Sequence, residues 1–242
     1  MRYPHHIKIY KKRWHLVVTF LTIVLPIVFI FVFSKIGGIS AGGVFVDIGA
    51  SFVRVIFAYI ISVALAIVFS LLLGSAKAEA FFLPLFDVLQ SFPSFALLPI
   101  FSIWFGVGNI TAILFLVMTM VWPILFSTLS SLHMVREDLK EASFVFGAQG
   151  GIKKLLHFTV PVAFPGIITG SIVGLGEGWE AIVGAEIIGI SPGIGGFLNK
   201  ASMDGNIPIL TFGIIALLLI LFSMNKLIWL PLLKKSHDYS HE

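Results

Sequence analysis

Six long apolar stretches constrain how this chain can fold more than any other feature. They lie at residues 16–34, 53–74, 81–104, 110–132, 162–188 and 207–231. A helix of about 20 residues crosses the roughly 30 Å hydrocarbon layer of a membrane. Because lipid offers no hydrogen-bond partners, backbone groups must pair within each stretch, and the alternation typical of barrel strands is missing. The sequence therefore predicts an all-α integral membrane protein with six transmembrane helices.

The composition excludes a soluble domain of this length. Hydrophobic residues make up 58% of the chain and charged residues 12%, and the mean hydropathy is +1.04. The chain has no cysteine, so disulfide and thiol chemistry are excluded. The sequence pI is about 9.4, but the basic residues lie beside the apolar stretches. This position is typical of topology signals, so we expect a lipid bilayer and no nucleic acid as a partner.

The first apolar stretch could be mistaken for a secretory signal peptide, because the basic run "KIYKKRWH" precedes it. The stretch is about 19 residues long, however, which exceeds a typical signal-peptide core. The following "SKIGGISAGG" also offers no clear small-x-small cleavage site. We therefore expect residues 16–34 to be retained as the first transmembrane helix, after an N-terminal arm at residues 1–15.

Lysine and arginine are unevenly divided between the two sides of the predicted spans. With the N-terminus in the cytoplasm, only Lys35, Arg54 and Lys200 of the 16 basic residues fall on the outer side. The cytoplasmic side receives all the others: Arg2, Lys8, Lys11, Lys12, Arg13, Lys77, Arg136, Lys140, Lys153, Lys154, Lys226, Lys234 and Lys235. By the positive-inside rule, both termini and the polar segment at residues 135–160 are predicted to be cytoplasmic. Arg54, at the outer start of the second stretch, is interpreted as a headgroup anchor.

The polar segment at residues 135–160 interrupts an otherwise apolar chain. Its first part, 135–147, is rich in helix formers and ends at Gly147, and its second part, 152–160, is expected to form a helix stopped by Pro161. Such a segment can be a solvated connector or a helix lying on the headgroups. It can equally be a docking element for a cytoplasmic partner, and composition alone leaves both open.

The segment resembles the EAA loop of permease subunits of binding-protein-dependent ABC importers, in which Glu-Ala-Ala is followed by three residues, a glycine and a terminal Leu-Pro. The chain supplies Glu141, Ala142, Ser143, Gly147 and Pro161. It departs by one extra residue between Gly147 and Pro161, and by a valine in place of the leucine. The resemblance implies that this loop seats in a groove of an ATPase. The implied ATPase-coupling residues are Glu141, Ala142, Ser143, Gly147, Lys153 and Lys154.

Three further matches, in the right order, extend the resemblance over roughly residues 45–200, to the nitrate/taurine/sulfonate branch of these permeases. The run "PLFDVLQSFPSFALLPIFSIWFGVG" keeps prolines at Pro84, Pro93 and Pro99. The run "GLGEGWEAIVGAEIIG" keeps Trp179 and the pair Ala185–Glu186, and "SPGIGGFL" follows. The resemblance implies a type I ABC importer permease-like fold.

What the resemblance implies for function is a transmembrane subunit in the cell membrane of a prokaryote. Two copies, an expected homodimer, enclose a translocation path, a cytoplasmic ABC ATPase dimer drives it, and an extracytoplasmic substrate-binding protein delivers a small-molecule substrate. The chain has no G-x-x-x-x-G-K-[ST] phosphate loop and no metal-ligand spacing, so ATP and magnesium are expected on the partner ATPase. We expect no cofactor and no enzymatic activity in this chain. The expected organisation is a permease core at 45–232, which contains the 135–160 loop, and a cytoplasmic tail at 233–242.

Three glutamates in or near the fifth stretch are unusual, because charge at membrane depth costs about 2.5–3.5 kcal/mol on insertion scales. At 100° per residue, Glu177 and Glu180 share one helix face, Glu186 points away from Glu177, and Trp179 lies about 200° from Glu177. The glutamates could be protonated or hydrogen-bonded across a tightly packed surface formed by glycines, namely Gly170, Gly174 and Gly178.

Alternatively, Glu177, Glu180 and Glu186 line the translocation path with Trp179. Such carboxylates favour a cationic or hydrogen-bond-donating cargo, such as an amine or a nitrogen heterocycle, over nitrate or a sulfonate. Pro93 and Pro99 are candidate path or gate residues as well, because irregular backbone at membrane depth is tolerated only where it is buried or lines a cavity.

Two rival classes of function remain at this stage. A proton-coupled secondary transporter or channel could use Glu177, Glu180 and Glu186 as relays, although the internal repeats common in such carriers are not found here. A scaffold or assembly factor would have no path at all. Dependence of uptake on ATP rather than on a proton gradient separates the importer from the first rival.

Overall fold

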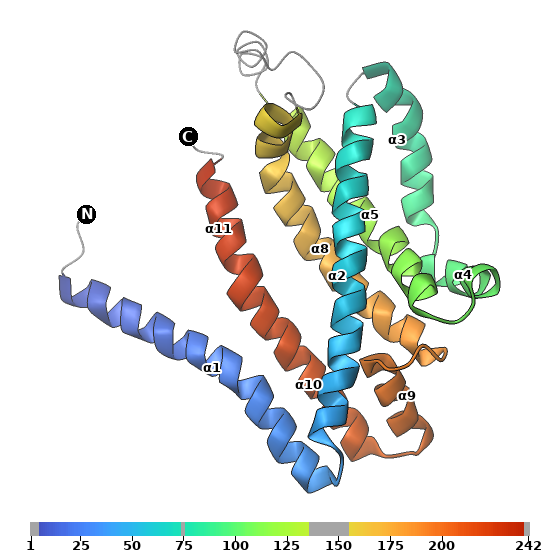
Figure 1. The fold of residues 1–242 in the computed structure, drawn as a ribbon. Coiled ribbons are helices and arrows are strands. Elements are labelled where there is room, and N and C mark those ends of the chain that lie inside the picture. Colours follow the sequence, from blue (N-terminus) through green and yellow to red (C-terminus); the bar gives the residue numbers. More distant parts are fainter. Residues whose placement is uncertain (1–4, 74–75, 136–154, 240–242) are drawn as a thin grey trace.

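The computed structural model describes residues 5–73, 76–135 and 155–239, and within these ranges the chain is helical with no strand. Short 3₁₀ and π turns at Ser94–Ala96, Leu155–Thr159 and Asn225–Trp229 join some of the helices. The helices shown in Figure 1 are α1 (His5–Gly37), α2 (Ala41–Leu72), α3 (Ala76–Ser91), α4 (Leu97–Phe105), α5 (Asn109–His133), α8 (Val160–Ile187), α9 (Ile194–Met203), α10 (Ile207–Met224) and α11 (Leu230–Tyr239).

The described helices agree with the predicted membrane spans. Five of them are long and apolar enough to cross a membrane: Val18–Gly37, Ala41–Leu72, Asn109–His133, His157–Ile187 and Ile207–Lys234. The pair Lys77–Ser91 and Ser94–Phe105, whose two halves meet at an angle of 74°, is either a broken sixth span or a re-entrant loop. The predicted all-helical fold is therefore confirmed with five membrane spans, and the number reaches the predicted six if the bent pair is one span.

The third apolar stretch, predicted as one helix at 81–104, is broken in two. Pro93 precedes the 3₁₀ turn with an extended backbone, and it has no N–H with which to continue α3. Pro99, in contrast, lies in the first turn of α4, where a missing N–H costs no helical hydrogen bond. Pro93 therefore marks the break in the backbone, and Pro99 does not.

A second prediction about proline is wrong. Pro161 was expected to stop a helix at 152–160, but the π turn Leu155–Thr159 continues directly into α8. Pro161 occupies the first turn of α8, where proline is tolerated for the same reason as Pro99. The fifth span therefore begins inside the segment that the sequence assigns to the cytoplasmic loop.

The centre of the molecule is α5, which packs against α2 on one side and α8 on the other. Glycines on α8 allow this approach: a Cβ at Gly170 would lie 2.6 Å from the Pro123 carbonyl oxygen and 2.7 Å from the Ile124 Cα. Gly166, Gly174 and Gly178 also face α5. The predicted tight packing is confirmed for Gly170, Gly174 and Gly178, and their spacing is the one typical of close helix pairs in membranes.

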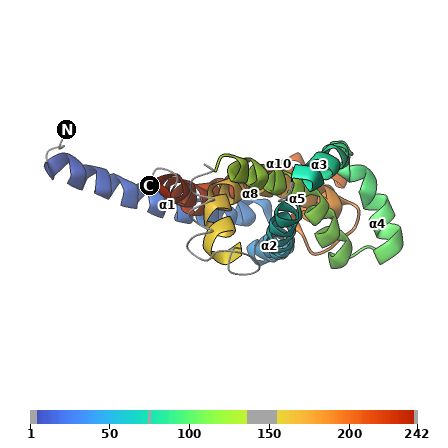
Figure 2. The same cartoon turned by 90° about the horizontal axis from the view of Figure 1, so that it is seen from above.

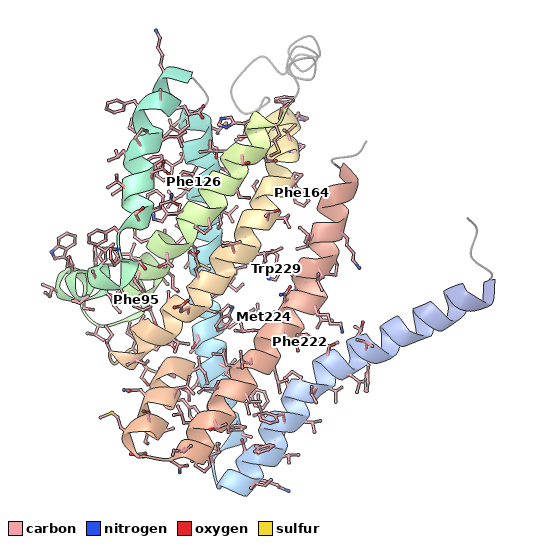
Figure 3. The ribbon with its side chains drawn as sticks, turned by 180° about the vertical axis from the view of Figure 1, so that it is seen from behind. Phe95, Phe126, Phe164, Phe222, Met224 and Trp229 are labelled. Atoms are coloured by element: carbon pink, nitrogen blue, oxygen red, sulfur yellow. The ribbon has the colours of Figure 1, made fainter. Side chains whose placement is uncertain are left out.

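The remaining helices surround this centre. The C-terminal part of α1 packs against α10, whereas the N-terminal half of α1 stands apart from the other helices (Figures 1 and 2). Trp229, labelled in Figure 3, lies in the turn before α11. It packs edge-on against Tyr59 of α2, with ring centroids 6.0 Å apart. Many large apolar side chains, such as Phe20 and Leu218, are exposed on the outer surface, as expected for contact with lipid.

The two ends of the bundle differ in what they carry. The turn between α1 and α2 and the short helix α9 lie at one end, and the start of α3, the end of α5 and the end of α11 lie at the other (Figure 1). The second end is the one the basic residues predict to be cytoplasmic, so below we call the α9 end the outer end.

Candidate functional site

A buried ion pair joins α2 to α8 at the outer end. The Arg54 Nη1 atom lies 2.6 Å from Glu186 Oε1, and the two residues are 4% and 1% exposed. Arg54 also donates from Nε to Asn109 Oδ1 at 2.7 Å and from Nη1 to the Pro192 carbonyl oxygen at 2.7 Å. One guanidinium thus connects α2, the start of α5, the end of α8 and the loop before α9.

This arrangement corrects the interpretation of Arg54 as a headgroup anchor. An anchor needs its guanidinium at the lipid–water boundary, but Arg54 is buried against a carboxylate from another helix. A buried charge requires such a partner, because desolvation without compensation is very costly. Arg54 is therefore a structural residue of the outer end.

The Glu186 carboxylate accepts hydrogen bonds from backbone and side chain as well as from Arg54. Gly195 N–H donates to Oε2 at 2.9 Å, and the Ser51 hydroxyl lies 2.8 Å from both carboxylate oxygens. The carboxylate thus sits at the N-terminus of α9, where unpaired N–H groups favour an anion. Any Cβ at Gly193 would collide with the carboxylate, which explains the glycine there.

Ser51 gives a first testable prediction. The Ser51 hydroxyl oxygen accepts a hydrogen bond from Ile194 N–H at 2.9 Å, and the hydroxyl donates to the Glu186 carboxylate. Ser51→Ala therefore removes one hydrogen-bond partner from the buried Ile194 N–H and one from the buried carboxylate. We expect a loss of about 1–3 kcal/mol in the free energy of unfolding, measured as a lower unfolding temperature in detergent. Ser62→Ala is the matched control, because the buried Ser62 hydroxyl bonds only to Ala58 O in its own helix. Equal shifts for the two variants would contradict the proposed role of Ser51.

The glutamates of α8 separate as the helical geometry predicts. Glu177 and Glu180 are exposed on the chain surface, while Glu186 and Trp179 are 1% and 4% exposed. Trp179 packs near Phe52 of α2, with ring centroids 6.4 Å apart. Because Glu186 and Trp179 are enclosed by the chain's own helices, their assignment to the path wall is not supported. The hypothesis remains a prediction for Glu177 and Glu180.

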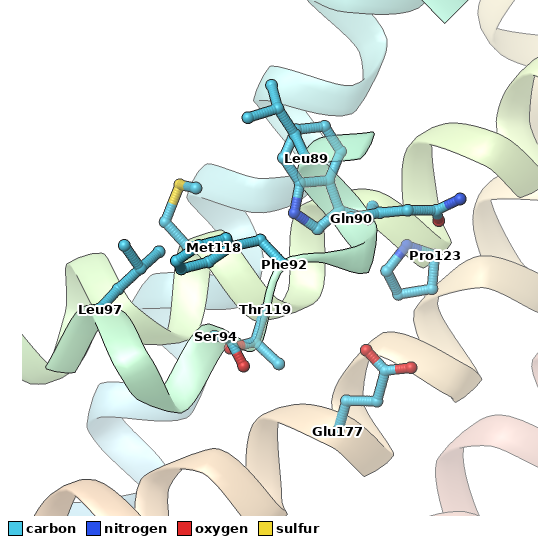
Figure 4. A pocket seen from close by; sticks show the side chains of 10 residues that line it. Leu89, Gln90, Phe92, Ser94, Leu97, Met118, Thr119, Pro123 and Glu177 are labelled. Carbon is cyan, nitrogen blue, oxygen red and sulfur yellow. The ribbon is translucent and has the colours of Figure 1, made fainter. Parts of the chain in front are cut away.

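Glu177 belongs to a cavity of about 170 Å³ between the α3–α4 break, α5 and α8. Its carboxylate points from α8 toward the side chains of α3 and α5 (Figure 4). The lining residues are Leu89, Gln90, Phe92, Ser94, Leu97, Met118, Thr119, Trp122, Pro123 and Glu177. The cavity thus opens beside Pro93, the predicted gate residue, at the place where the backbone breaks.

The predicted ATPase-coupling residues lie outside the described residues. These are Glu141, Ala142, Ser143, Gly147, Lys153 and Lys154, all within 136–154. The described chain ends at residue 135 after α5 and resumes at 155 before α8, at the end of the bundle opposite α9 (Figure 1). The loop is therefore anchored at both sides to the tightly packed α5–α8 pair. Within the described ranges, no group of three or more His, Cys, Asp or Glu side chains could hold a metal ion.

Comparison with known proteins gives a match along most of the chain. Residues 62–228, more than half of the 242 residues, match the model of the family described as "Binding-protein-dependent transport system inner membrane component". This range includes the α3–α4 break, the α5–α8 pair and the segment at 136–154. It also includes Glu177 and Glu186 but begins after Arg54.

Several named relatives have similar sequences. The taurine transport system permease protein TauC of Escherichia coli (strain K12) is 29% identical over 180 residues, covering 74% of this chain and 65% of the relative. The nitrate import permease protein NrtB of Synechocystis is 32% identical over 160 residues, covering 66% of this chain and 58% of the relative. The putative aliphatic sulfonates transport permease protein SsuC of Bacillus subtilis is 27% identical over 179 residues, covering 73% and 63%. The matches thus span less than two thirds of these relatives' lengths.

Proposed function

The chain belongs to the binding-protein-dependent transport system inner membrane components, of the nitrate/taurine/sulfonate branch, and from this we propose that it is the permease subunit of an ABC importer. The observation that carries the proposal is the family match, which runs through the packed α5–α8 pair and the polar segment between them. In this role the chain forms a path for a small solute and hydrolyses no ATP itself.

Coupling to a cytoplasmic ATPase is proposed to pass through the loop between α5 and α8. The segment between residues 135 and 155 joins α5 to α8, and these two helices pack tightly against each other. A force applied to this loop therefore acts on the tightly packed helices α5 and α8. The glycines that hold α8 against α5 support this role, because displacement of α8 is transmitted to α5 by backbone contact.

The outer end is proposed to receive the substrate-binding protein, and a second copy of the chain is proposed to complete the path. The Arg54–Glu186 network supports the first of these, because it makes the α8–α9 connection a firm surface at the outer end. Exposed Glu177 and Glu180 on α8 support the second, since intramembrane carboxylates are expected to face a cavity or a partner and not lipid. Both termini are proposed to be cytoplasmic, in the cell membrane.

The proton-coupled alternative has less support. A relay needs its carboxylates within reach of one another, whereas Glu186 is paired with Arg54 inside the chain and Glu177 and Glu180 lie on another face. Uptake into vesicles that is driven by internal ATP and persists after collapse of the proton gradient favours the importer. Uptake that requires the gradient and not ATP would favour the relay.

The coupling proposal is tested by co-purification of an ATPase with the tagged chain from its native cells in mild detergent. Gly147→Arg is expected to reduce the amount of ATPase recovered by about tenfold or more, because a long charged side chain blocks a close helix-to-groove contact. Quantitative mass spectrometry of the eluate, normalised to the chain, measures the loss.

Gly150→Arg is the matched control. It adds the same side chain to the same loop, outside the positions that match the EAA pattern. ATPase recovery close to the wild-type level with Gly150→Arg, together with loss in Gly147→Arg, supports docking through the motif. Absence of any ATPase with the wild-type chain would overturn the proposed function.

A further inference from the structure

The cavity beside the α3–α4 break lies between the two ends of the α8 span. Glu177 is about ten residues from the end of α8 at Ile187, which corresponds to roughly 15 Å along the helix axis. It is farther still from the start of α8 at Val160. A carboxylate at this depth is costly unless it meets a partner, and such residues in membranes commonly mark a substrate or ion pathway.

Glu177 has no cationic partner in the described part of the chain. Arg54 is paired with Glu186 and His133 with Glu79, so neither of these basic side chains is paired with Glu177. The ten lining residues include no lysine, arginine or histidine. The Glu177 carboxyl is thus the one ionisable group among the ten lining residues, and when it is ionised a positively charged occupant is its natural counterion.

Other lining groups suit an organic cation better than a hydrated metal ion. Phe92 and Trp122 contribute aromatic rings to the wall, and rings attract ammonium groups through their negative faces. Trp122 also packs against Phe86, with ring centroids 5.7 Å apart. The Thr119 hydroxyl donates to Phe115 O at 3.0 Å, so its oxygen lone pairs can accept a hydrogen bond from an occupant.

The volume limits the size of the occupant. The cavity measures about 170 Å³, and an engineered protein cavity of about 150 Å³ is known to hold benzene. A quaternary ammonium or protonated amine of that size fits within it. Apolar contact with Leu97 and Met118 suits the methyl or methylene groups of such a cation.

We propose that this cavity is a cargo subsite that binds a small organic ammonium ion, and that the Glu177 carboxylate pairs with the positive charge of this ion. The proposal rests on the proposed function, because it gives the importer its class of cargo. The occupant sits where the backbone breaks at Pro93, so movement of α4 against α5 alters its surroundings directly. Glu180 is one turn away on the same exposed face but does not line the cavity.

Glu177→Gln and Glu180→Gln therefore form a matched pair for the test. Each removes one carboxylate from the exposed face of α8 and keeps the shape of the side chain. The purified chain is placed in nanodiscs of phosphatidylglycerol, so that no lipid ammonium group competes. Equilibrium binding is measured for choline and for 3,3-dimethylbutanol, its neutral carbon isostere, with nitrate and ethanesulfonate as anionic probes.

Choline is expected to bind at millimolar concentration or below, and at least about tenfold more tightly than the neutral isostere. Glu177→Gln should weaken choline binding by about tenfold or more and leave the isostere unaffected, while Glu180→Gln changes choline binding by less than about twofold. The proposal is overturned by equal binding of choline and its isostere, by equal effects of the two variants, by preference for nitrate or ethanesulfonate, or by no binding of choline.

The test is separate from that of the proposed function. Binding to the purified chain needs no ATPase, so the chain can fail to recover an ATPase and still bind choline, or the reverse. Repeating the measurement in phosphatidylethanolamine nanodiscs separates a free solute from a lipid headgroup as the source of the ammonium group. Unchanged choline affinity assigns the site to a solute, and a large loss would overturn its role as a cargo site.

Discussion

Arg54→Ala is expected to destabilise the folded protein by about 3–5 kcal/mol, because it leaves a buried carboxylate without its charged partner. Arg54 and Glu186 are 4% and 1% exposed, so water cannot replace the lost guanidinium without opening the outer end. The substitution also removes the hydrogen bonds that Arg54 donates to Asn109 Oδ1 and to the Pro192 carbonyl oxygen. The measurement is the unfolding temperature of the purified chain in detergent, followed by tryptophan fluorescence.

Two controls identify the cause of the effect. Lys35→Ala removes an exposed basic residue from the same end of the bundle. If Arg54 were only a headgroup anchor, Arg54→Ala and Lys35→Ala would change the unfolding temperature by similar amounts. The double variant Arg54→Met with Glu186→Met removes both charges, and it should be more stable than Arg54→Ala alone. An unfolding temperature for Arg54→Ala equal to that of Lys35→Ala would contradict the account of the ion pair.

Gly170→Ala is expected to have the second large effect. The added methyl group would lie 2.6 Å from the Pro123 carbonyl oxygen and 2.7 Å from the Ile124 Cα, and neither backbone atom can rotate away. Overpacking of this kind costs about 1–3 kcal/mol or more. This cost exceeds the gain of about 1 kcal/mol that alanine normally brings to a helix interior. We expect a lower unfolding temperature and a lower yield of folded protein.

Gly176→Ala supplies the comparison on the same helix. Nothing lies within 4 Å of a Cβ at Gly176, so the chain purified alone should be as stable as the wild type or slightly more stable. A fall in unfolding temperature with Gly170→Ala but not with Gly176→Ala attributes the effect to the α5–α8 contact. Similar behaviour of the two variants would mean that this contact does not limit the stability of the bundle.

Much of the architecture could be predicted because apolar length and helical period are local properties. The stretches at 16–34, 110–132 and 207–231 each fall within a described helix that is long enough to cross a membrane. The 100° period also separated Glu177 and Glu180 from Glu186, which requires only that the segment be one continuous helix. The glycine spacing on α8 predicted close packing for the same local reason.

The errors arose where a partner distant in sequence decides the outcome. Arg54 lies at the outer start of an apolar stretch, but its carboxylate partner is 132 residues further along the chain. One signal was available: Asp47, Ser51 and Arg54 recur at helical spacing, so that three polar side chains share a face of α2. A polar face in a membrane helix predicts a polar partner, although not which one.

The prolines show a second limit of the sequence. Pro93, Pro99 and Pro161 are chemically identical, yet one lies at a break and the other two lie in first turns of helices. Which of these applies depends on where the neighbouring helix begins, and that depends on packing against α5. The cavity at Glu177 could not be predicted for the same reason, because its walls come from three separate segments.

Cross-linking from a single cysteine tests the central claim most directly, since the chain has no cysteine of its own. Ser143→Cys places a thiol in the proposed coupling loop, and Met203→Cys places one at the outer end, on a side chain that is 80% exposed. Each variant is labelled with a photoreactive maleimide in native membranes, irradiated, and its adducts are identified by mass spectrometry. The account predicts an adduct with an ABC ATPase from Ser143→Cys and none from Met203→Cys. Efficient labelling of Ser143→Cys without any ATPase adduct would contradict the claim that this chain is the permease of an ABC importer.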